Sequence, residues 1–315
     1  MSLREYAQTY KPFHYPGFME AARKHENIHW VEDELDLGED VEQWSNGSIT
    51  VIEKNLITQI LRLFTQTDTQ VGQNYCDLWI PTFKNNEVRC MLLSFAAREG
   101  IHQRAYALLN DTLGFPDEDY KAFLEYEEMV DKIELMQSND ATTDVGLGLS
   151  LAQTVCNEGM SLFAAFVMLL NFQRFGKMKG MCKIAEWSLR DETQHVSGMA
   201  SLFIQYCKEN PQVVTDEFKH KVYSYYRNAI AAEDKFIDLV FEMGEPAGIS
   251  KEEVKQYIRY IADRRLTQIG FKTNWNVGEN PLPWLEWVLK EGTTNFFEQR
   301  VSEYNAAGMT GDWGW

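Results

Sequence analysis

The sequence lacks the usual features of a secreted, membrane-spanning or nucleic-acid-binding protein. Its five cysteines are scattered, and none form a Cys-x-x-Cys pair, so a reducing compartment is expected rather than a disulfide framework. The longest apolar run covers only residues 162–170, whereas a bilayer span needs about 20 residues, and the N-terminus has no signal-like apolar segment. Acidic residues outnumber basic ones by 47 to 30, which disfavours a nucleic-acid partner. We therefore expect a cytoplasmic protein without a membrane span.

The sequence also lacks strand-like alternation and low-complexity linkers. Apolar residues recur instead every three to four positions, which predicts helices. The expected helices cover about residues 49–78, 86–112, 117–137, 147–175, 181–208, 212–243 and 250–269. Several approach 30 residues, a length typical of helical bundles. The pattern predicts an N-terminal segment over 1–48, a bundle over 49–300 and a flexible C-terminal tail over 301–315.

Two copies of a Glu-x-x-His motif lie in helical sequence with apolar flanks. They are Glu99/His102 and Glu192/His195. Residues i and i+3 of a helix lie about 60° apart on one face, so each motif directs a carboxylate and an imidazole toward one point. Two further copies lie among charged residues and are expected on solvated faces. They are Glu26/His29 and Glu217/His220.

One carboxylate in another predicted helix precedes each apolar-flanked motif. Asp68 comes 31 residues before Glu99, and Glu158 comes 34 residues before Glu192. Glu158 begins a nearly apolar stretch, where a glutamate must lie at an exposed helix end, be paired or bind a metal. The repeated arrangement predicts six ligands from four helices around two metal ions.

The chemistry of these six residues favours particular metals. Four carboxylates buried together would repel one another, and two divalent ions would balance their charge. Mixed oxygen and nitrogen ligands without thiolate suit iron or manganese better than structural zinc. Two iron ions, two manganese ions or a mixed pair all remain open at this point.

The order of the motifs resembles the small, radical-generating subunit of class I ribonucleotide reductase, over roughly residues 25–305. The matching pieces are HWVEDELDL (29–37), Asp68, EGIHQRAY (99–106), EGMSLF (158–163), RDETQH (190–195) and NFFEQRVSEY (295–304). The resemblance implies an all-α, ferritin-like bundle with a dinuclear metal site between four core helices. It also implies a centre that reacts with oxygen and oxidises a tyrosine to a stable radical, which the large subunit uses to reduce ribonucleotides to deoxyribonucleotides.

The resemblance assigns roles to individual residues. One metal would be bound by Asp68, Glu99 and His102, and the other by Glu158, Glu192 and His195, with at least one carboxylate bridging. Tyr106 would carry the radical, and it follows His102 by four residues, about 40° around and roughly 6 Å along the same helix face. Asp191 would hydrogen-bond both His102 and Trp30, although Trp30 could also be an ordinary packing residue.

The resemblance also predicts partners and a radical pocket. Tyr304 matches a tail tyrosine that relays the radical across the subunit interface, and the C-terminal tail would dock on the large subunit of a homodimeric protein. Leu162 and Phe166 are candidates to line an apolar pocket around Tyr106, or they are simply core residues. Ser188 is polar where an apolar residue is expected.

Two alternatives share the same ligand pattern. The first is a stand-alone dimetal oxidase of the ferritin-like fold, and the second is a metal-storage protein without enzymatic activity. Tyr304 with its tail and the Trp30–Asp191 pair argue against the first. Storage proteins assemble into cages and need no tail tyrosine, so sizing the native protein would separate the second.

Overall fold

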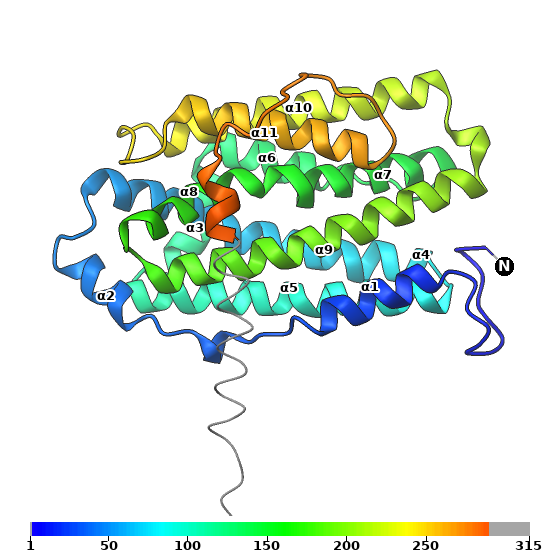
Figure 1. The fold of residues 1–315 in the computed structure, drawn as a ribbon, viewed down its shortest axis with the longest axis horizontal. Coiled ribbons are helices and arrows are strands. Elements are labelled where there is room, and N and C mark those ends of the chain that lie inside the picture. Colours follow the sequence, from blue (N-terminus) through cyan, green and yellow to red (C-terminus); the bar gives the residue numbers. More distant parts are fainter. Residues whose placement is uncertain (1, 290–315) are drawn as a thin grey trace, which may run out of the picture.

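The computed structural model describes residues 2–289, and every regular element in that part of the chain is a helix (Figure 1). The α-helices are α1 (Pro16–Glu26), α2 (Gly38–Ser45), α3 (Val51–Asn74), α4 (Ile80–Thr82), α5 (Asn86–Leu113), α6 (Glu127–Met136), α7 (Asp144–Cys156), α8 (Phe163–Leu170), α9 (Lys179–Glu209), α10 (Asp216–Val240) and α11 (Lys251–Gln268). The predicted all-α class is therefore confirmed.

The long helices form a bundle around one apolar core. Helix α5 packs against α3 and α9, and α9 also packs against α7 and α8. Helices α6, α10 and α11 lie together along another side, and α1 lies across α5 and α9 (Figure 1). The N-terminal segment is thus packed on the bundle, whereas the predicted tail over 301–315 lies outside the described residues.

Local sequence signals define the ends of the core helices. Thr50 accepts a hydrogen bond from the Glu53 amide while the Glu53 carboxylate accepts one from the Thr50 amide, a reciprocal cap at the start of α3. The Asn85 side chain caps α5. Gly114 ends α5 at φ 81°, a left-handed conformation that glycine adopts without a Cβ penalty.

The helix predicted over 117–137 is divided in the structure. A 3₁₀ helix covers Asp117–Glu125, Tyr126 is extended, and α6 follows. Arg62 of α3 explains this break, because its guanidinium donates hydrogen bonds to Asp119 at 2.8 Å and to the Tyr126 hydroxyl at 3.0 Å. These tertiary contacts override the local helical pattern.

The helix predicted over 147–175 is also interrupted, by a π-helical turn at Asn157–Ser161 between α7 and α8. Such a turn holds one extra residue and changes the direction in which its side chains point. Two side-chain donors bind this turn: the buried Lys132 Nζ lies 2.7 Å from the Ser161 carbonyl, and the partly buried Arg265 Nε lies 2.9 Å from the Gly159 carbonyl. A Cβ at Gly159 would lie only 2.7 Å from the Arg265 side chain, so this close approach requires glycine.

Lys132 also forms a buried ion pair. Its Nζ lies 2.7 Å from a carboxylate oxygen of Glu233, and both side chains are almost fully excluded from solvent. Burial raises the pKa of Glu233 to about 7, opposed by the charge of Lys132, and burial lowers the pKa of Lys132. The pair therefore joins α6 and α10 to the π-helical turn.

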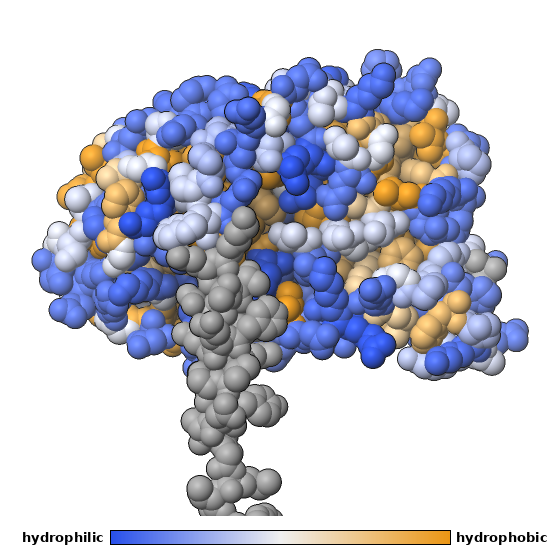
Figure 2. Space-filling view, viewed as in Figure 1, coloured by the Kyte–Doolittle hydropathy of each residue, from blue (hydrophilic) through white to orange (hydrophobic). Residues whose placement is uncertain are grey.

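One stretch, 144–175, is long and apolar enough to cross a membrane by length and composition, yet its apolar window is wholly buried inside the protein. A core helix of a globular protein has the same composition. On the face drawn in Figure 2, hydrophilic side chains cover most of the surface, with apolar ones gathered in smaller patches between them.

Replacing Lys132 with methionine should lower the free energy of unfolding by about 3 kcal/mol, because Glu233 is left buried without its partner. The double variant Lys132→Met/Glu233→Leu should lose less than the single variant, since it removes both charges. Urea unfolding followed by circular dichroism on metal-free protein measures both values. A double variant less stable than Lys132→Met would contradict this account.

Candidate metal centre

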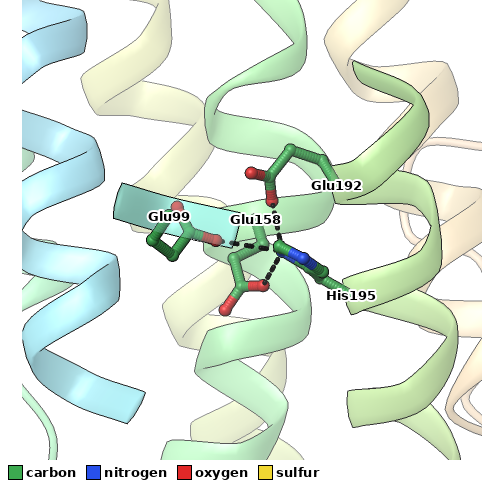
Figure 3. Close-up of side chains that lie close together, drawn as sticks. All are labelled: Glu99, Glu158, Glu192 and His195. Atoms are coloured by element: carbon green, nitrogen blue, oxygen red, sulfur yellow. Dashed lines mark ion pairs between the residues drawn. The ribbon is translucent and has the colours of Figure 1, made fainter. Parts of the chain in front are cut away.

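The structure brings all six predicted ligands into the bundle core, where none is more than 3% exposed. They come from α3 (Asp68), α5 (Glu99, His102), the π-helical turn (Glu158) and α9 (Glu192, His195). Figure 3 shows four of them converging, with the His195 ring facing the carboxylates of three different segments. The ligand atoms of these four residues lie within 4.8 Å of one another.

Both imidazoles point their Nδ1 atoms at the carboxylates. His195 Nδ1 lies 3.0 Å from Glu99, 3.5 Å from Glu192 and 3.6 Å from Glu158. His102 Nδ1 lies 3.3 Å from Glu192 and 3.6 Å from Glu99. Glu99 and Glu192 therefore each lie near both histidines, on two different oxygens.

These separations match shared coordination of metal ions. Two donors that are each about 2.1 Å from one ion lie roughly 3.0–3.4 Å apart at octahedral to tetrahedral angles. The observed nitrogen–oxygen distances of 3.0–3.6 Å fall in or near this range. Glu99 and Glu192 would each be placed to hold two ions, one beside each histidine, whereas Glu158 lies on the side of His195.

Without cations, the cluster carries a heavy electrostatic penalty. Burial raises the pKa of Asp68 and of Glu158 well above the usual carboxyl range, and neighbouring carboxylates add to this effect. Burial also acts to raise the pKa of Glu99, but the nearby imidazoles of His102 and His195 outweigh it and lower that pKa to about 2. Burial acts to lower the pKa of His195, but the carboxylates of Glu192 and Glu99 outweigh it and raise that pKa to about 10.

Several polar atoms of the cluster have no hydrogen-bond partner among the described residues. They are one oxygen of Asp68, both oxygens of Glu99 and Glu192, and Nδ1 of His195. Buried polar atoms are normally satisfied, so a whole group of unsatisfied ligand atoms facing one another is the chemistry of a cation-binding site. Two divalent ions would balance the four carboxylates. The residues therefore fit a dinuclear metal site.

Asp191 holds the other side of His102. One of its carboxylate oxygens accepts hydrogen bonds from Trp30 Nε1 at 2.7 Å, Arg98 at 2.8 Å and His102 Nε2 at 3.2 Å. With the Nε2 proton committed to Asp191, the Nδ1 lone pair of His102 is free to face a metal. Burial acts to raise the pKa of Asp191, but the hydrogen bond and charge of His102 lower it well below the usual range. The structure thus brings together His102, Asp191 and Trp30, whose functional roles stay predictions.

Tyr106 lies beside the cluster in an apolar setting. Its ring centroid is 4.8 Å from that of Phe64, which in turn packs at 5.0 Å on Phe166. Burial raises the pKa of the Tyr106 phenol well above its usual value, the charge of Asp68 adds to this, and Ser188 opposes it. Leu162 is buried as well. The phenol is therefore neutral, and its hydroxyl has no hydrogen-bond partner among the described residues.

Other predicted residues have simpler outcomes. Tyr304 lies outside the described residues, so its role stays a prediction. Both Glu-x-x-His copies that were expected on solvated faces are exposed. They are Glu26/His29 and Glu217/His220.

Sequence reasoning missed two buried neighbours of the ligands. The Tyr75 hydroxyl donates a hydrogen bond to Glu158 at 2.8 Å, and His25 contacts His195 at 3.1 Å. Both lie at core spacing. Tyr75 comes seven residues after Asp68, in the π-helical turn Tyr75–Trp79 that continues α3, and His25 is buried with Phe18 and Ala22 on the inner face of α1. This spacing was the one feature of the sequence that could have indicated that Tyr75 and His25 are buried, but the polar residues around them obscured it.

Comparison with known proteins agrees with this geometry. A family model described as "Ribonucleotide reductase, small chain" matches residues 7–281. The chain is 40% identical to a probable ribonucleoside-diphosphate reductase small subunit of Invertebrate iridescent virus 3, over 98% of this chain and 86% of that protein.

Solved structures show the same fold. The ribonucleotide reductase R2 subunit from Clostridium botulinum has a TM-score of 0.83 at 21% identity, covering 90% of this chain and 91% of that one. The dimanganese(II) NrdF protein of Streptococcus sanguinis has a TM-score of 0.79 at 17% identity, covering 91% of this chain and 99% of that one. At these identities the structural likeness establishes the fold alone, and it confirms the predicted bundle type.

Metal binding should stabilise the folded protein, because ions relieve the repulsion between buried carboxylates. At a free Mn²⁺ concentration of about 100 times the dissociation constant, the free energy of unfolding should rise by roughly 2.7 kcal/mol, seen as a higher melting temperature. Glu192→Gln should lose most of this gain. Glu217→Gln, in the exposed copy of the motif, is the matched control and should keep it. Equal stabilisation of both variants by Mn²⁺ would argue against a site at Glu192.

Proposed function

The chain belongs to the ribonucleotide reductase small-chain family, and from that premise we propose that it is the metal- and radical-bearing subunit of a ribonucleoside-diphosphate reductase. The observation that carries the proposal is the position of the neutral, buried Tyr106 phenol beside six converging ligands. Bound metal ions would supply the oxidising power of activated oxygen. Tyr106 would lose one electron and one proton to become a tyrosyl radical.

The surroundings of Tyr106 support a stable radical. A neutral phenol must release its proton as it is oxidised, and the carboxylate of Asp68 is the charged neighbour with the largest influence on it. Phe64 covers the ring and is itself covered by Phe166, which limits contact with water and reductants. The polar Ser188 is the exception in this pocket.

We propose iron as the bound metal, with manganese or a mixed pair as alternatives. The six side chains offer oxygen and imidazole nitrogen but no thiolate, and such ligands accept iron and manganese alike. The solved neighbour from Streptococcus sanguinis is a dimanganese(II) protein, so the fold accommodates manganese in at least one relative.

The proposed partners are a second copy of the chain and a large catalytic subunit, acting together in the cytoplasm. The C-terminal tail would dock on the large subunit, and Tyr304 would relay the radical across the interface. The hydrogen-bonded set His102, Asp191 and Trp30 supports a route that begins at the metal site and leads away from it through α9 to the N-terminal segment.

Tyr106→Phe should abolish the tyrosyl-radical signal in electron paramagnetic resonance after metal loading under air, while the protein still binds two ions. Phenylalanine fills the same volume but has no phenol to oxidise. Tyr226→Phe is the matched control, because Tyr226 is also fully buried and its hydroxyl has no hydrogen-bond partner among the described residues. An unchanged radical spectrum in Tyr106→Phe would remove this residue from the proposed role.

Tyr304→Phe should separate radical formation from its use. The variant should form the same amount of Tyr106 radical as the wild type, since the six proposed ligands and Tyr106 are unchanged. Ribonucleotide reduction with the large subunit should fall to background, because the relay needs an oxidisable side chain. Retained turnover in Tyr304→Phe would exclude the tail tyrosine from the relay.

A further inference from the structure

His25 of α1 is a fully buried imidazole that contacts a metal-ligand candidate. Its Nε2 lies 3.1 Å from Nε2 of His195, and its Nδ1 lies 2.8 Å from the Ser94 hydroxyl of α5. The rings of Phe95 and His25 pack edge to face, with their centroids 5.0 Å apart. The Phe95 ring also packs on His195, at a centroid distance of 4.5 Å. His25 therefore joins α1, α5 and α9 behind the proposed metal site.

Metal binding by His195 determines which ring nitrogens of His195 and His25 carry a proton. His195 Nδ1 faces the carboxylates and must be unprotonated to bind a metal, so its proton lies on Nε2. Two facing nitrogens at 3.1 Å need one donor and one acceptor, so His25 Nε2 is the unprotonated acceptor. The proton of His25 then lies on Nδ1 and is donated to the Ser94 hydroxyl.

The two proposed ligand histidines are thus held by different kinds of acceptor. His102 donates its Nε2 proton to the carboxylate of Asp191, whereas His195 donates its Nε2 proton to the neutral imidazole of His25. An anionic acceptor makes an imidazole more basic and a stronger metal ligand than a neutral acceptor does. The charge of Asp191 is shared with Arg98 and Trp30 but is not removed.

We infer that His25 is a positioning residue that fixes the tautomer and orientation of His195. As a result, the metal position at His195 has a lower affinity than the position at His102. This inference rests on the proposed metal binding. Metal-free protein should then take up Mn²⁺ in two steps, with the position at His102 filled first. The N-terminal helix α1 would act on the metal site without supplying a ligand.

The test compares Mn²⁺ titrations of metal-free wild type, His25→Leu and His25→Gln, followed by electron paramagnetic resonance of free and spin-coupled Mn²⁺. His25→Leu should weaken one step about 10- to 100-fold and leave the other unchanged. In His25→Gln the amide oxygen can accept the hydrogen bond from His195 Nε2, so this variant should recover most of the affinity for Mn²⁺. Equal weakening of both steps, no weakening at all, or a His25→Gln variant as weak as His25→Leu would overturn the inference.

A second measurement reports on the tautomer directly and does not depend on activity. The measurement is nuclear magnetic resonance of Zn²⁺-loaded protein with ¹⁵N-labelled histidine, to which only the six histidines of the chain contribute. The His195 Nε2–H should give a signal that is protected from exchange with water. Ser94→Ala is the second variant, for use if His25→Leu does not fold. It leaves His25 in place, so the protein should fold, and it should weaken the protection of the His195 signal. An unprotected signal in the wild type would overturn the role of His25, whereas a wild type that binds no Mn²⁺ or Zn²⁺ would count against the proposed function itself.

Discussion

The mutual repulsion of carboxylates buried side by side is the constraint on which the rest of this structure depends. Glu99, Glu158 and Glu192 place their oxygens within a few ångströms of one imidazole, at a depth where an isolated charge is strongly disfavoured. A chain can keep such a cluster only if rigid elements hold it and cations compensate it. Long helices meet the first need, since each presents its ligand from a packed face in a core that excludes water. The unsatisfied oxygens show that the side chains alone do not compensate the negative charge of the cluster.

Holding Glu158 in the cluster requires a departure from regular helix geometry. Backbone carbonyls of the π-helical turn at Asn157–Ser161 accept hydrogen bonds from the side chains of Lys132 and Arg265. Lys132 is held in turn by Glu233, so a buried ion pair on the far side of the turn supports the position of a ligand. Tyr75, in a second π-helical turn at Tyr75–Trp79, donates a hydrogen bond to Glu158. Both irregular turns therefore act on the same carboxylate.

The parts of this site that could be predicted from sequence follow from helix periodicity. Glu99 and His102 share a face because they are three residues apart, and that holds in any α-helix. The π-helical turn could not be predicted, because the donors that stabilise it lie in α6 and α11, far away in sequence. His25 could not be paired with His195 either, since 170 residues separate them and the packing of α1 across α9 brings them together. The break at Tyr126 has the same origin, in a contact with Arg62 of another helix.

Helix α5 connects these features more closely than any other described element. It carries the ligands Glu99 and His102, the proposed radical residue Tyr106, and, one turn apart, Ser94 and Arg98. Ser94 accepts a hydrogen bond from His25, and Arg98 donates one to Asp191. Helix α5 therefore supports the partners of both proposed ligand histidines and supplies one of these histidines itself. A small shift of α5 along its axis would therefore move ligands, radical residue and both supporting contacts together. Packing against α1, α3 and α9, together with the Asn85 cap and the turn at Gly114, holds α5 against such a shift.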